Sequence, residues 1–200
     1  SENGIARHVL EFFVGFPEVI VIESSRMANP YHVIRRLAET LNAEGRALRD
    51  RFAAGFLFWT GVRLGEVLAT RKRDVDLITR TYNVPTLKQR RDRPVYRPIP
   101  LTHVPARELK LWDRYFEEFS IRGDDRVLSL SDRQVERIVK KVLGAQYTPH
   151  SLRHGLGLWL YEYTKDVRVV AQVLRHTNIA NTLIYTRLSL DAVREKLRIE

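Results

Sequence analysis

Residues 60–77 read TGVRLGEVLATRKRDVDL, and the interpretation of the whole chain starts from this stretch. Gly61 permits a tight turn, so Arg63 is expected at a helix start, where unpaired backbone amides point outward. Glu66 follows three residues later on the same helical face, where its carboxylate can hold the guanidinium in one orientation. Taken alone, such a pair is more often a solvated surface ion pair than a phosphate site, so the rest of the chain must decide.

The charge of the chain favours a polyanionic partner. Lysine and arginine number 34 and aspartate and glutamate 24, which gives a formal net charge of +10. Arginine supplies 27 of the 34 basic residues, and its planar fork of donors suits phosphate oxygens. A basic surface that is merely solvated is the alternative interpretation. The excess charge therefore indicates nucleic acid, without deciding between DNA and RNA.

Composition indicates a soluble globular protein. Hydrophobic residues make up 44% and charged residues 29% of the 200 residues, enough for one domain with a short appendage. The chain has no cysteine, which excludes disulfides and thiolate zinc sites. The apolar stretch EFFVGFPEVIVI at residues 11–22 is interrupted by Pro17 and Glu18, so it is too short and too acidic for a membrane span or a signal peptide. We therefore expect a soluble, cytoplasmic protein with no membrane partner.

Apolar spacing predicts a mainly helical α+β domain with a small antiparallel sheet inserted between helices. Residues 75–101 are rich in β-branched and aromatic side chains and contain several prolines, which predicts two or three short strands with a basic turn near 89–93. Helix signals such as Thr148 as cap and Pro149 in the first turn occur on either side. The expected helices cover residues 31–43, 47–60, 64–70, 104–119, 132–143, 148–165, 167–174, 179–185 and 189–197.

A second cluster, HSLRH at residues 150–154, again places a cation near a helix start. His150 and Arg153 are three residues apart and project from one helical face. His150 and His154 are four residues apart and could instead be zinc ligands. However, the acidic residue of a metalloprotease helix is missing between them, and the chain offers no thiolate. Metal binding is therefore the weaker interpretation.

A third cluster, LRHTNIANTLIYTRLS, occupies residues 174–189. His176 follows an apolar helix, and Tyr185 lies nine residues later. Asn178 and Asn181 between them suit caps or turns. A lone histidine or tyrosine in such a place is more often structural than catalytic.

Together, these side chains match what phosphoryl transfer from DNA needs in the absence of a metal ion. Fixed cationic donors stabilise the charge that grows on the non-bridging oxygens in the transition state. A tyrosine that attacks phosphorus forms a covalent phosphotyrosine, which conserves the energy of the broken phosphodiester. The leaving 5′ oxygen needs a proton, which a lysine on a hairpin can deliver.

The chain resembles the catalytic domain of the tyrosine recombinase, or phage-type integrase, family. The family pattern is TG-[LV]-R-x-x-E, a hairpin lysine, H-x-x-R, L-G-H, and a tyrosine about nine residues further on. This chain has TGVRLGE, TLKQRRDRP, HSLRH, LRH and TLIYTRLS in the same order, over about residues 47–188. The resemblance implies a mainly helical domain with a small antiparallel sheet that wraps on duplex DNA.

The resemblance also implies site-specific DNA cleavage and rejoining through a covalent 3′-phosphotyrosine, with no cofactor and no metal. Tyr185 is then the nucleophile, and Arg63 and Arg153 clamp the scissile phosphate. Lys88 is the expected general acid, because the hairpin has no other lysine between residues 72 and 110.

The other matching residues take supporting roles by the same resemblance. His150 and His176 are expected to assist proton transfer and to contact the phosphate. Glu66 matches the acidic residue that supports the first arginine. Further DNA contacts are expected from basic residues of the hairpin and of the third cluster: Arg90, Arg91, Arg93 and Arg175.

Arg175 departs from the family pattern, because glycine usually precedes the histidine of the third cluster. If that position needs a positive φ, a side chain there costs about 1 kcal/mol, so the local turn is expected to differ. Alternatively, Arg175 adds a contact to a DNA phosphate. His176 and its spacing to Tyr185 are intact, so activity is expected to survive the substitution.

The expected organisation is an N-terminal segment of uncertain structure (1–30), a catalytic domain (31–188) and a tail helix (189–200). Family members usually carry an N-terminal core-binding domain, for which residues 1–46 are too short. The chain is therefore either a catalytic fragment or a minimal enzyme. Expected partners are double-stranded DNA and further copies of the chain, as a tetramer on paired sites. The tail either folds onto its own core or is exchanged between protomers.

Two other functions stay open at this point. A type IB topoisomerase shares the tyrosine chemistry, but the short spacing from His176 to Tyr185 and the compact chain favour a recombinase. A DNA-binding module that has lost catalysis is the other alternative, although the complete set of candidate residues argues against it. The target DNA sequence is not legible, because base contacts and DNA deformability are spread over many residues.

Overall fold

A computed structural model describes residues 28–87, 95–176 and 178–186 of the chain. The helices are α2 (Pro30–Glu39), α3 (Gly45–Thr60), α4 (Leu64–Ala69), α5 (Ala106–Glu118), α6 (Asp132–Leu143), α7 (Pro149–Thr164) and α8 (Val167–Leu174). The strands are β1 (Val75–Asp76), β2 (Thr81–Thr86) and β3 (Val95–Pro100). Three short 3₁₀ turns are η1 (Lys72–Asp74), η2 (Ile179–Asn181) and η3 (Leu183–Thr186). The expected fold class, mainly helical with a small antiparallel sheet, is confirmed.

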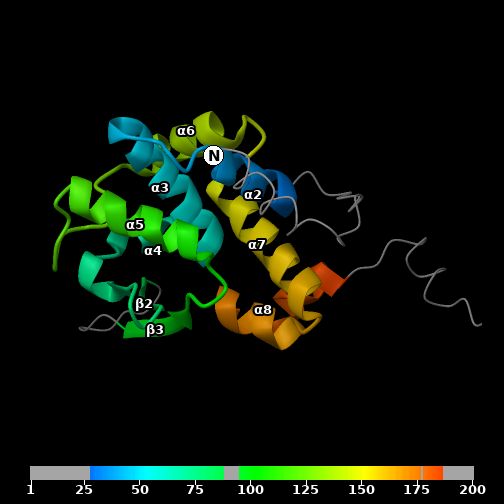
Figure 1. Ribbon diagram of the computed structural model, residues 1–200. Helices are drawn as coiled ribbons and strands as arrows, with labels where there is room; N and C mark the ends of the chain where they lie inside the picture. The colour runs from blue at the N-terminus through cyan, green and yellow to red at the C-terminus, as the bar shows by residue number, and fades with distance from the viewer. Residues whose placement is uncertain (1–27, 88–94, 177, 187–200) are drawn as a thin grey trace, which may run out of the picture.

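Helix α3 forms the centre of the domain and contacts α5, α6 and α7 (Figure 1). Every residue from Asp50 to Thr60 is buried, so this helix has neighbours on all sides. It ends at Gly61, whose φ of 58° lies in the left-handed region and whose N–H bonds the carbonyl of Leu57 at 3.1 Å. The tight turn expected at Gly61 is confirmed, and it redirects the chain into α4.

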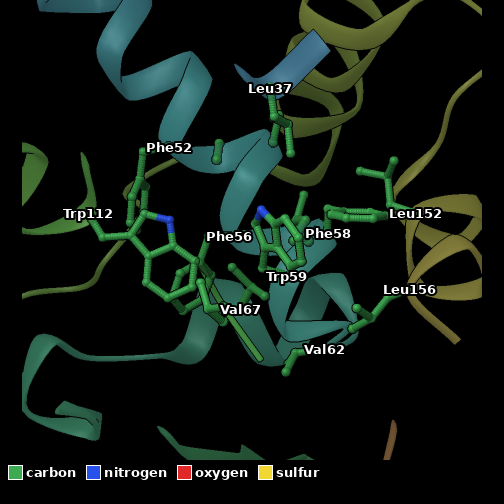
Figure 2. Close-up of a cluster of buried hydrophobic side chains, with 14 of the residues drawn as sticks. Leu37, Phe52, Phe56, Phe58, Trp59, Val62, Val67, Trp112, Leu152 and Leu156 are labelled. Carbon is green, nitrogen blue, oxygen red and sulfur yellow. The ribbon is translucent and has the colours of Figure 1, made fainter. Parts of the chain in front are cut away.

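Large apolar side chains pack on opposite sides of α3. The Phe56 and Trp112 rings lie 4.9 Å apart between centroids, and Phe52 meets Trp112 edge to face at 6.2 Å. Figure 2 shows these three rings together, with Leu152 and Leu156 of α7 on the other side of the helix. The core therefore joins α5 and α7 through α3, which fixes the position of α7 relative to the Gly61 turn.

The three strands form one antiparallel sheet in the order β1–β2–β3. Tyr82 of β2 pairs with Val75 of β1 on one side and with Ile99 of β3 on the other. Tyr82 and Val84 are buried while Asn83 between them is exposed, as expected for a sheet with one face on the core. The strands expected within residues 75–101 are confirmed, whereas the expected basic turn lies outside the described residues.

Polar side chains cap several helix starts, and the cap expected at Thr148 is confirmed. Asn29 accepts hydrogen bonds from the backbone of Tyr31 and His32 at the start of α2. Thr148 accepts one from the Ser151 backbone at the start of α7, at 3.1 Å. Within the described ranges, no helix is long and apolar enough to cross a membrane.

Two helix predictions near the chain ends have different outcomes. The helix expected at 179–185 is wrong, since the structure has two 3₁₀ turns there. The Asn178 side chain accepts from the Ala180 backbone at 2.9 Å, and this local bond favours a turn over an α-helix. The helix expected at 189–197 lies outside the described residues.

Arg51 and Glu108 form a buried ion pair between α3 and α5. Their side chains are 1% and 3% exposed, and two parallel hydrogen bonds of 2.8 and 2.6 Å join them. Glu108 also accepts from Trp112 Nε1 at 3.1 Å, and Arg51 Nε donates to the Leu37 carbonyl at 3.0 Å. Gly55 leaves space for the pair, because a Cβ there would lie 2.2 Å from Glu108 Oε1.

Removal of one partner of this pair is expected to destabilise the fold more than removal of both partners. Arg51→Met leaves a buried carboxylate without its cation and should lower the free energy of unfolding by about 3–5 kcal/mol. The double variant Arg51→Met/Glu108→Leu should recover most of this loss in urea denaturation followed by circular dichroism. Arg35→Met breaks only an exposed pair with Glu39, so a change below about 1 kcal/mol is expected of this control. A double variant as unstable as the single one would contradict the prediction.

Candidate active site

Arg63 lies where the sequence places it, at the junction of α3 and α4. It is the N-cap residue of α4, directly after the turn at Gly61. Its backbone N–H donates to Glu66 Oε2 at 3.2 Å, and its guanidinium lies 3.6 Å from Glu66 Oε1. The side chain is 47% exposed. Arg63 is thus held at its base by Glu66 while its charged end stays accessible.

Arg153 joins three elements around the same junction. It is buried on α7, and its guanidinium donates to the carbonyl oxygens of Gly61 and Leu174. Among the described residues, no carboxylate forms an ion pair with it. Burial, followed by the charges of Arg63 and Arg175, lowers the pKa of Arg153 to about 10. The group is therefore a fixed cation whose charge lacks an acidic partner.

Arg175 keeps the turn that a glycine would make. Its φ of 55° and ψ of 45° are left-handed, so the expectation of a different turn is wrong. This conformation costs roughly 1 kcal/mol for a residue with a side chain. The Arg175 Nε, buried and without a hydrogen-bond partner within the described part of the chain, adds to that cost. A 2.6 Å ion pair with Glu66, buried on both sides, offsets it.

Glu66 consequently serves two arginines, and its shorter contact is to Arg175 instead of Arg63. The Arg175 guanidinium points inward to this carboxylate, so the residue lies inside the site and its side chain is 6% exposed. Arg63 and Arg175 thus share one carboxylate, and the guanidinium of Arg153 adds a third positive charge nearby; these three groups are called the arginine cluster. Such an excess of fixed positive charge favours an anion in the adjacent space.

A hollow of about 330 Å³ opens beside the arginine cluster. It lies between the start of α4 and the start of α7. Its lining includes Arg63, His150 and Arg153, together with the carboxylate of Glu136. The three residues expected to meet at a phosphate are therefore brought together.

Tyr185 lies in η3 against α7 of its own chain. The residue is 3% exposed, and its ring covers Gly157, where a Cβ would lie 2.5 Å from Tyr185 Cζ. Its hydroxyl lies 2.8 Å from His154 Nδ1. Burial raises the pKa of Tyr185 to about 12, and the charge of Arg153 opposes this rise. The phenol is therefore neutral at physiological pH.

The sequence analysis missed the contact of His154 with the tyrosine, because the pair with His150 was considered only as a zinc site. The Nε2 atoms of His154 and His150 lie 2.9 Å apart, and the rings meet edge to face at 4.4 Å. Among the described residues, no group of three or more acidic or histidine side chains could hold a metal ion. The four-residue spacing placed both rings on one face, but nothing in it revealed the approach of Tyr185.

His176 stacks beside the tyrosine from the end of α8. Its ring lies 6.5 Å from that of Tyr185 at an interplanar angle of 10°, and its Nδ1 lies 2.8 Å from Thr182 Oγ1. Burial lowers its pKa to about 4, and the charges of Arg153 and Arg63 act in the same direction. His176 is thus neutral at physiological pH and close to both the tyrosine and the arginine cluster.

The hairpin residues of the expected site lie outside the described residues. These are the expected general acid and three expected DNA contacts: Lys88, Arg90, Arg91 and Arg93. Their roles stay predictions.

Comparison with known proteins agrees with this geometry. Residues 30–191 match the phage integrase family. The chain belongs to this family. The resemblance to tyrosine recombinase catalytic domains is thereby confirmed.

Similar proteins of this family include recombinases of archaea and bacteria. Tyrosine recombinase XerA of Thermococcus kodakarensis is 32% identical over 153 residues, which are 74% of this chain and 54% of that protein. Tyrosine recombinase XerC of Staphylococcus carnosus is 29% identical over 80% of this chain and 56% of its own length. The chain therefore spans about half the length of the curated relatives it matches.

Solved structures of integrase-family proteins share the fold. The crystal structure of XerA recombinase aligns with a TM-score of 0.62 at 26% identity, over 90% of this chain and 65% of that one. The catalytic domain of bacteriophage HP1 integrase aligns with a TM-score of 0.56 at 17% identity, over 86% of this chain and 92% of its own. At that identity the second comparison shows the fold alone.

The neutral histidines of this integrase-family site should make its stability depend on pH. The pKa values of His154 and His176 are lowered from 6.5 to about 4, so the unfolded chain binds more protons between these values. The free energy of unfolding should therefore fall as the pH is lowered from about 6.5 to about 4. Urea denaturation at several pH values measures this. His154→Gln and His176→Gln should each flatten the dependence, and unchanged slopes would contradict the assignment.

Proposed function

We propose that this chain is the catalytic part of a site-specific DNA recombinase that cleaves and rejoins DNA through a covalent 3′-phosphotyrosine at Tyr185, without a metal ion. One observation carries the proposal: Arg153, whose charge acts on Tyr185, lines the same hollow as the exposed Arg63, and positive charge exceeds negative charge there. Family membership supports the same reaction. The activity of the longer relatives is extended to this chain as part of the proposal.

The arginine cluster is suited to a scissile phosphate. Arg63 has an exposed guanidinium and Arg153 a buried one, and both line the hollow. In our proposal they bind the two non-bridging oxygens and stabilise the charge that grows there in the transition state. Arg175 acts from inside the site. Its ion pair with Glu66 takes up part of the negative charge of that carboxylate, so Arg63 keeps more positive charge for the phosphate.

The proposed chemistry is an in-line displacement at phosphorus. The oxygen of Tyr185 forms the new bond to phosphorus while the bond to the 5′ oxygen breaks, and Lys88 protonates that leaving oxygen. In the rejoining step a 5′ hydroxyl attacks the phosphotyrosine and the phenol is released. His150 and His176 assist proton transfer around the phosphate.

Double-stranded DNA is the proposed partner. Solved relatives with this fold include XerH bound to its difH substrate and the Tn1549 transposon integrase in complex with transposon DNA. We extend DNA binding to this chain, with further contacts from Arg90, Arg91 and Arg93 of the hairpin. The proposal includes assembly as a tetramer on paired DNA sites and association with the nucleoid. Its domain organisation is an N-terminal segment (1–30), a catalytic domain (31–188) and a tail helix (189–200).

Covalent capture of DNA tests this function directly. The chain is incubated with fragmented genomic DNA, denatured in detergent, and the attached DNA is sequenced to map the attachment site. A duplex built on this sequence and nicked near the scissile phosphate should then accumulate a covalent complex with the wild type. Tyr185→Phe should bind the duplex equally well and form no complex, because only the attacking oxygen is lost.

The same assay separates the alternatives. A wild type that binds the fragmented genomic DNA but becomes attached to none of it would show a DNA-binding module instead of an enzyme. Relaxation of a plasmid without any strand-exchange product would show a topoisomerase.

Arg153→Lys tests the arginine cluster. Lysine keeps the charge, but its single nitrogen replaces the two guanidinium nitrogens that reach Gly61 and Leu174 separately, so the cation is misplaced and covalent-complex formation should slow by about 10²–10³-fold. Arg35→Lys, at an exposed position on α2, is the matched control and should leave the rate unchanged. An Arg153→Lys variant that is folded and fully active would contradict the proposed clamp.

A further inference from the structure

Three side chains form a continuous hydrogen-bonded chain from the interior of the site to its surface. The Tyr185 hydroxyl lies 2.8 Å from His154 Nδ1, and His154 Nε2 lies 2.9 Å from His150 Nε2. Tyr185 is buried, His154 is half-buried and His150 is exposed beside the hollow. His154 itself has no role in the function proposed above.

The direction of these hydrogen bonds follows from the need of the buried Tyr185 O–H for an acceptor. A neutral imidazole carries one N–H, so each ring donates through one nitrogen and accepts through the other. Within the described residues, His154 Nδ1 is the only hydrogen-bond partner of the Tyr185 hydroxyl. If His154 donated to the phenol, the buried O–H would have no acceptor, which is costly. The hydroxyl therefore donates to His154, and His154 Nε2–H donates to His150.

We propose that His154 is a further catalytic residue, which accepts the proton of Tyr185 as the tyrosine attacks and passes its own Nε2 proton to His150. This inference rests on the function proposed above. It makes His154 the general base for the nucleophile and His150 the exit of the proton.

The transfer is balanced atom by atom. The Tyr185 O–H bond breaks, its proton goes to His154 Nδ1, and the electron pair left on oxygen forms the bond to phosphorus. The His154 Nε2 proton moves to the His150 Nε2 lone pair, so His154 stays neutral and His150 becomes an imidazolium. The pair of the broken phosphodiester bond stays on the 5′ oxygen, which takes its proton from Lys88. Reversal of the same steps returns the proton when the DNA is rejoined.

The charges around the chain make this transfer depend on bound phosphate. His154 faces His150 and Arg153 on α7 and Tyr185 on η3, while Arg63 and Arg153 act on His150. Burial and then these neighbours lower the pKa of His154 to about 4 and lower that of His150. A phosphate on Arg63 and Arg153 offsets those positive charges, so both rings bind a proton more readily when DNA occupies the site. The imidazolium of His150 then forms next to the phosphate, which stabilises it.

A first test reads the proton positions without DNA. In ¹⁵N-histidine-labelled protein, ring nitrogen shifts should show His154 with its proton on Nε2 and His150 with its proton on Nδ1. His154→Gln and His150→Gln assign the signals. A proton on His154 Nδ1 would overturn the proposal, because His154 would then donate to the phenol.

A second test separates proton transfer from positioning. It uses the nicked duplex built on the mapped attachment sequence, with wild type, His154→Ala and His154→Asn. The oxygen of asparagine can accept the tyrosine hydrogen bond, but the amide cannot take up the proton. Both variants should therefore form the covalent complex about 10²-fold more slowly than wild type. An asparagine variant with the wild-type rate would show positioning alone and overturn the proposal.

The leaving group supplies a further discrimination. With sulfur in place of the scissile 5′ oxygen the leaving group needs no proton, so Lys88→Met should be slow on ordinary DNA and fast on this substrate. His154→Ala should stay slow on both substrates, because its defect lies at the nucleophile. Rescue of His154→Ala by sulfur would place it at the leaving group and overturn the proposal.

His32 is the matched control for removal of a histidine–tyrosine contact. Its Nδ1 lies 2.6 Å from the hydroxyl of Tyr147, a tyrosine with no part in the proposed reaction, so His32→Asn removes a similar pair and should leave the cleavage rate unchanged. Failure of the wild type to form any complex would instead refute the proposed function. A wild type that reacts while folded His154→Ala reacts equally fast would refute only the role of His154.

Discussion

The site depends on how α8 is tied to the junction of α3 and α4. Arg153 donates to carbonyl oxygens on both sides of this contact, at Gly61 and at Leu174. Next to Leu174, the Arg175 guanidinium reaches Glu66 across the same contact at 2.6 Å. Buried charges persist only where they have fixed partners, and here each partner belongs to a different segment of the chain. The arginine cluster therefore holds the fold together at the place where it leaves positive charge unneutralised.

Burial and charge act differently on the tyrosine and on the histidines of this site. At Tyr185 they oppose one another, because burial disfavours the phenolate and Arg153 favours it. At His154 and His176 they act together, since both disfavour the imidazolium. Without an anion the site therefore holds a neutral phenol beside neutral imidazoles. That state is stable, and it contains both a proton donor and proton acceptors.

The sequence predicted the fold and the identity of the site residues better than their contacts. Local signals were sufficient for helix starts such as Thr148 and for the turn at Gly61, because caps and positive φ leave residue-type signatures. The turn at Arg175 was misjudged. The sequence shows the cost of a positive φ at a residue with a side chain, but it does not show the ion pair with the distant Glu66 that offsets this cost. His154 was missed because the approach of Tyr185, 31 residues away, is a tertiary event. Spacing along one helix cannot report such a contact.

The way Tyr185 is held suits a nucleophile whose proton acceptor lies beside it. It lies on a short 3₁₀ turn, its ring rests on the bare surface at Gly157, and one hydrogen bond to His154 holds its hydroxyl. Its backbone N–H bonds the carbonyl of Thr182, whose hydroxyl in turn contacts His176. Its polar contacts are therefore local, and they couple the tyrosine to two histidines next to the arginine cluster. The hydrogen bond to His154 keeps a proton acceptor beside the nucleophile, while the rigid arginines keep the target position fixed.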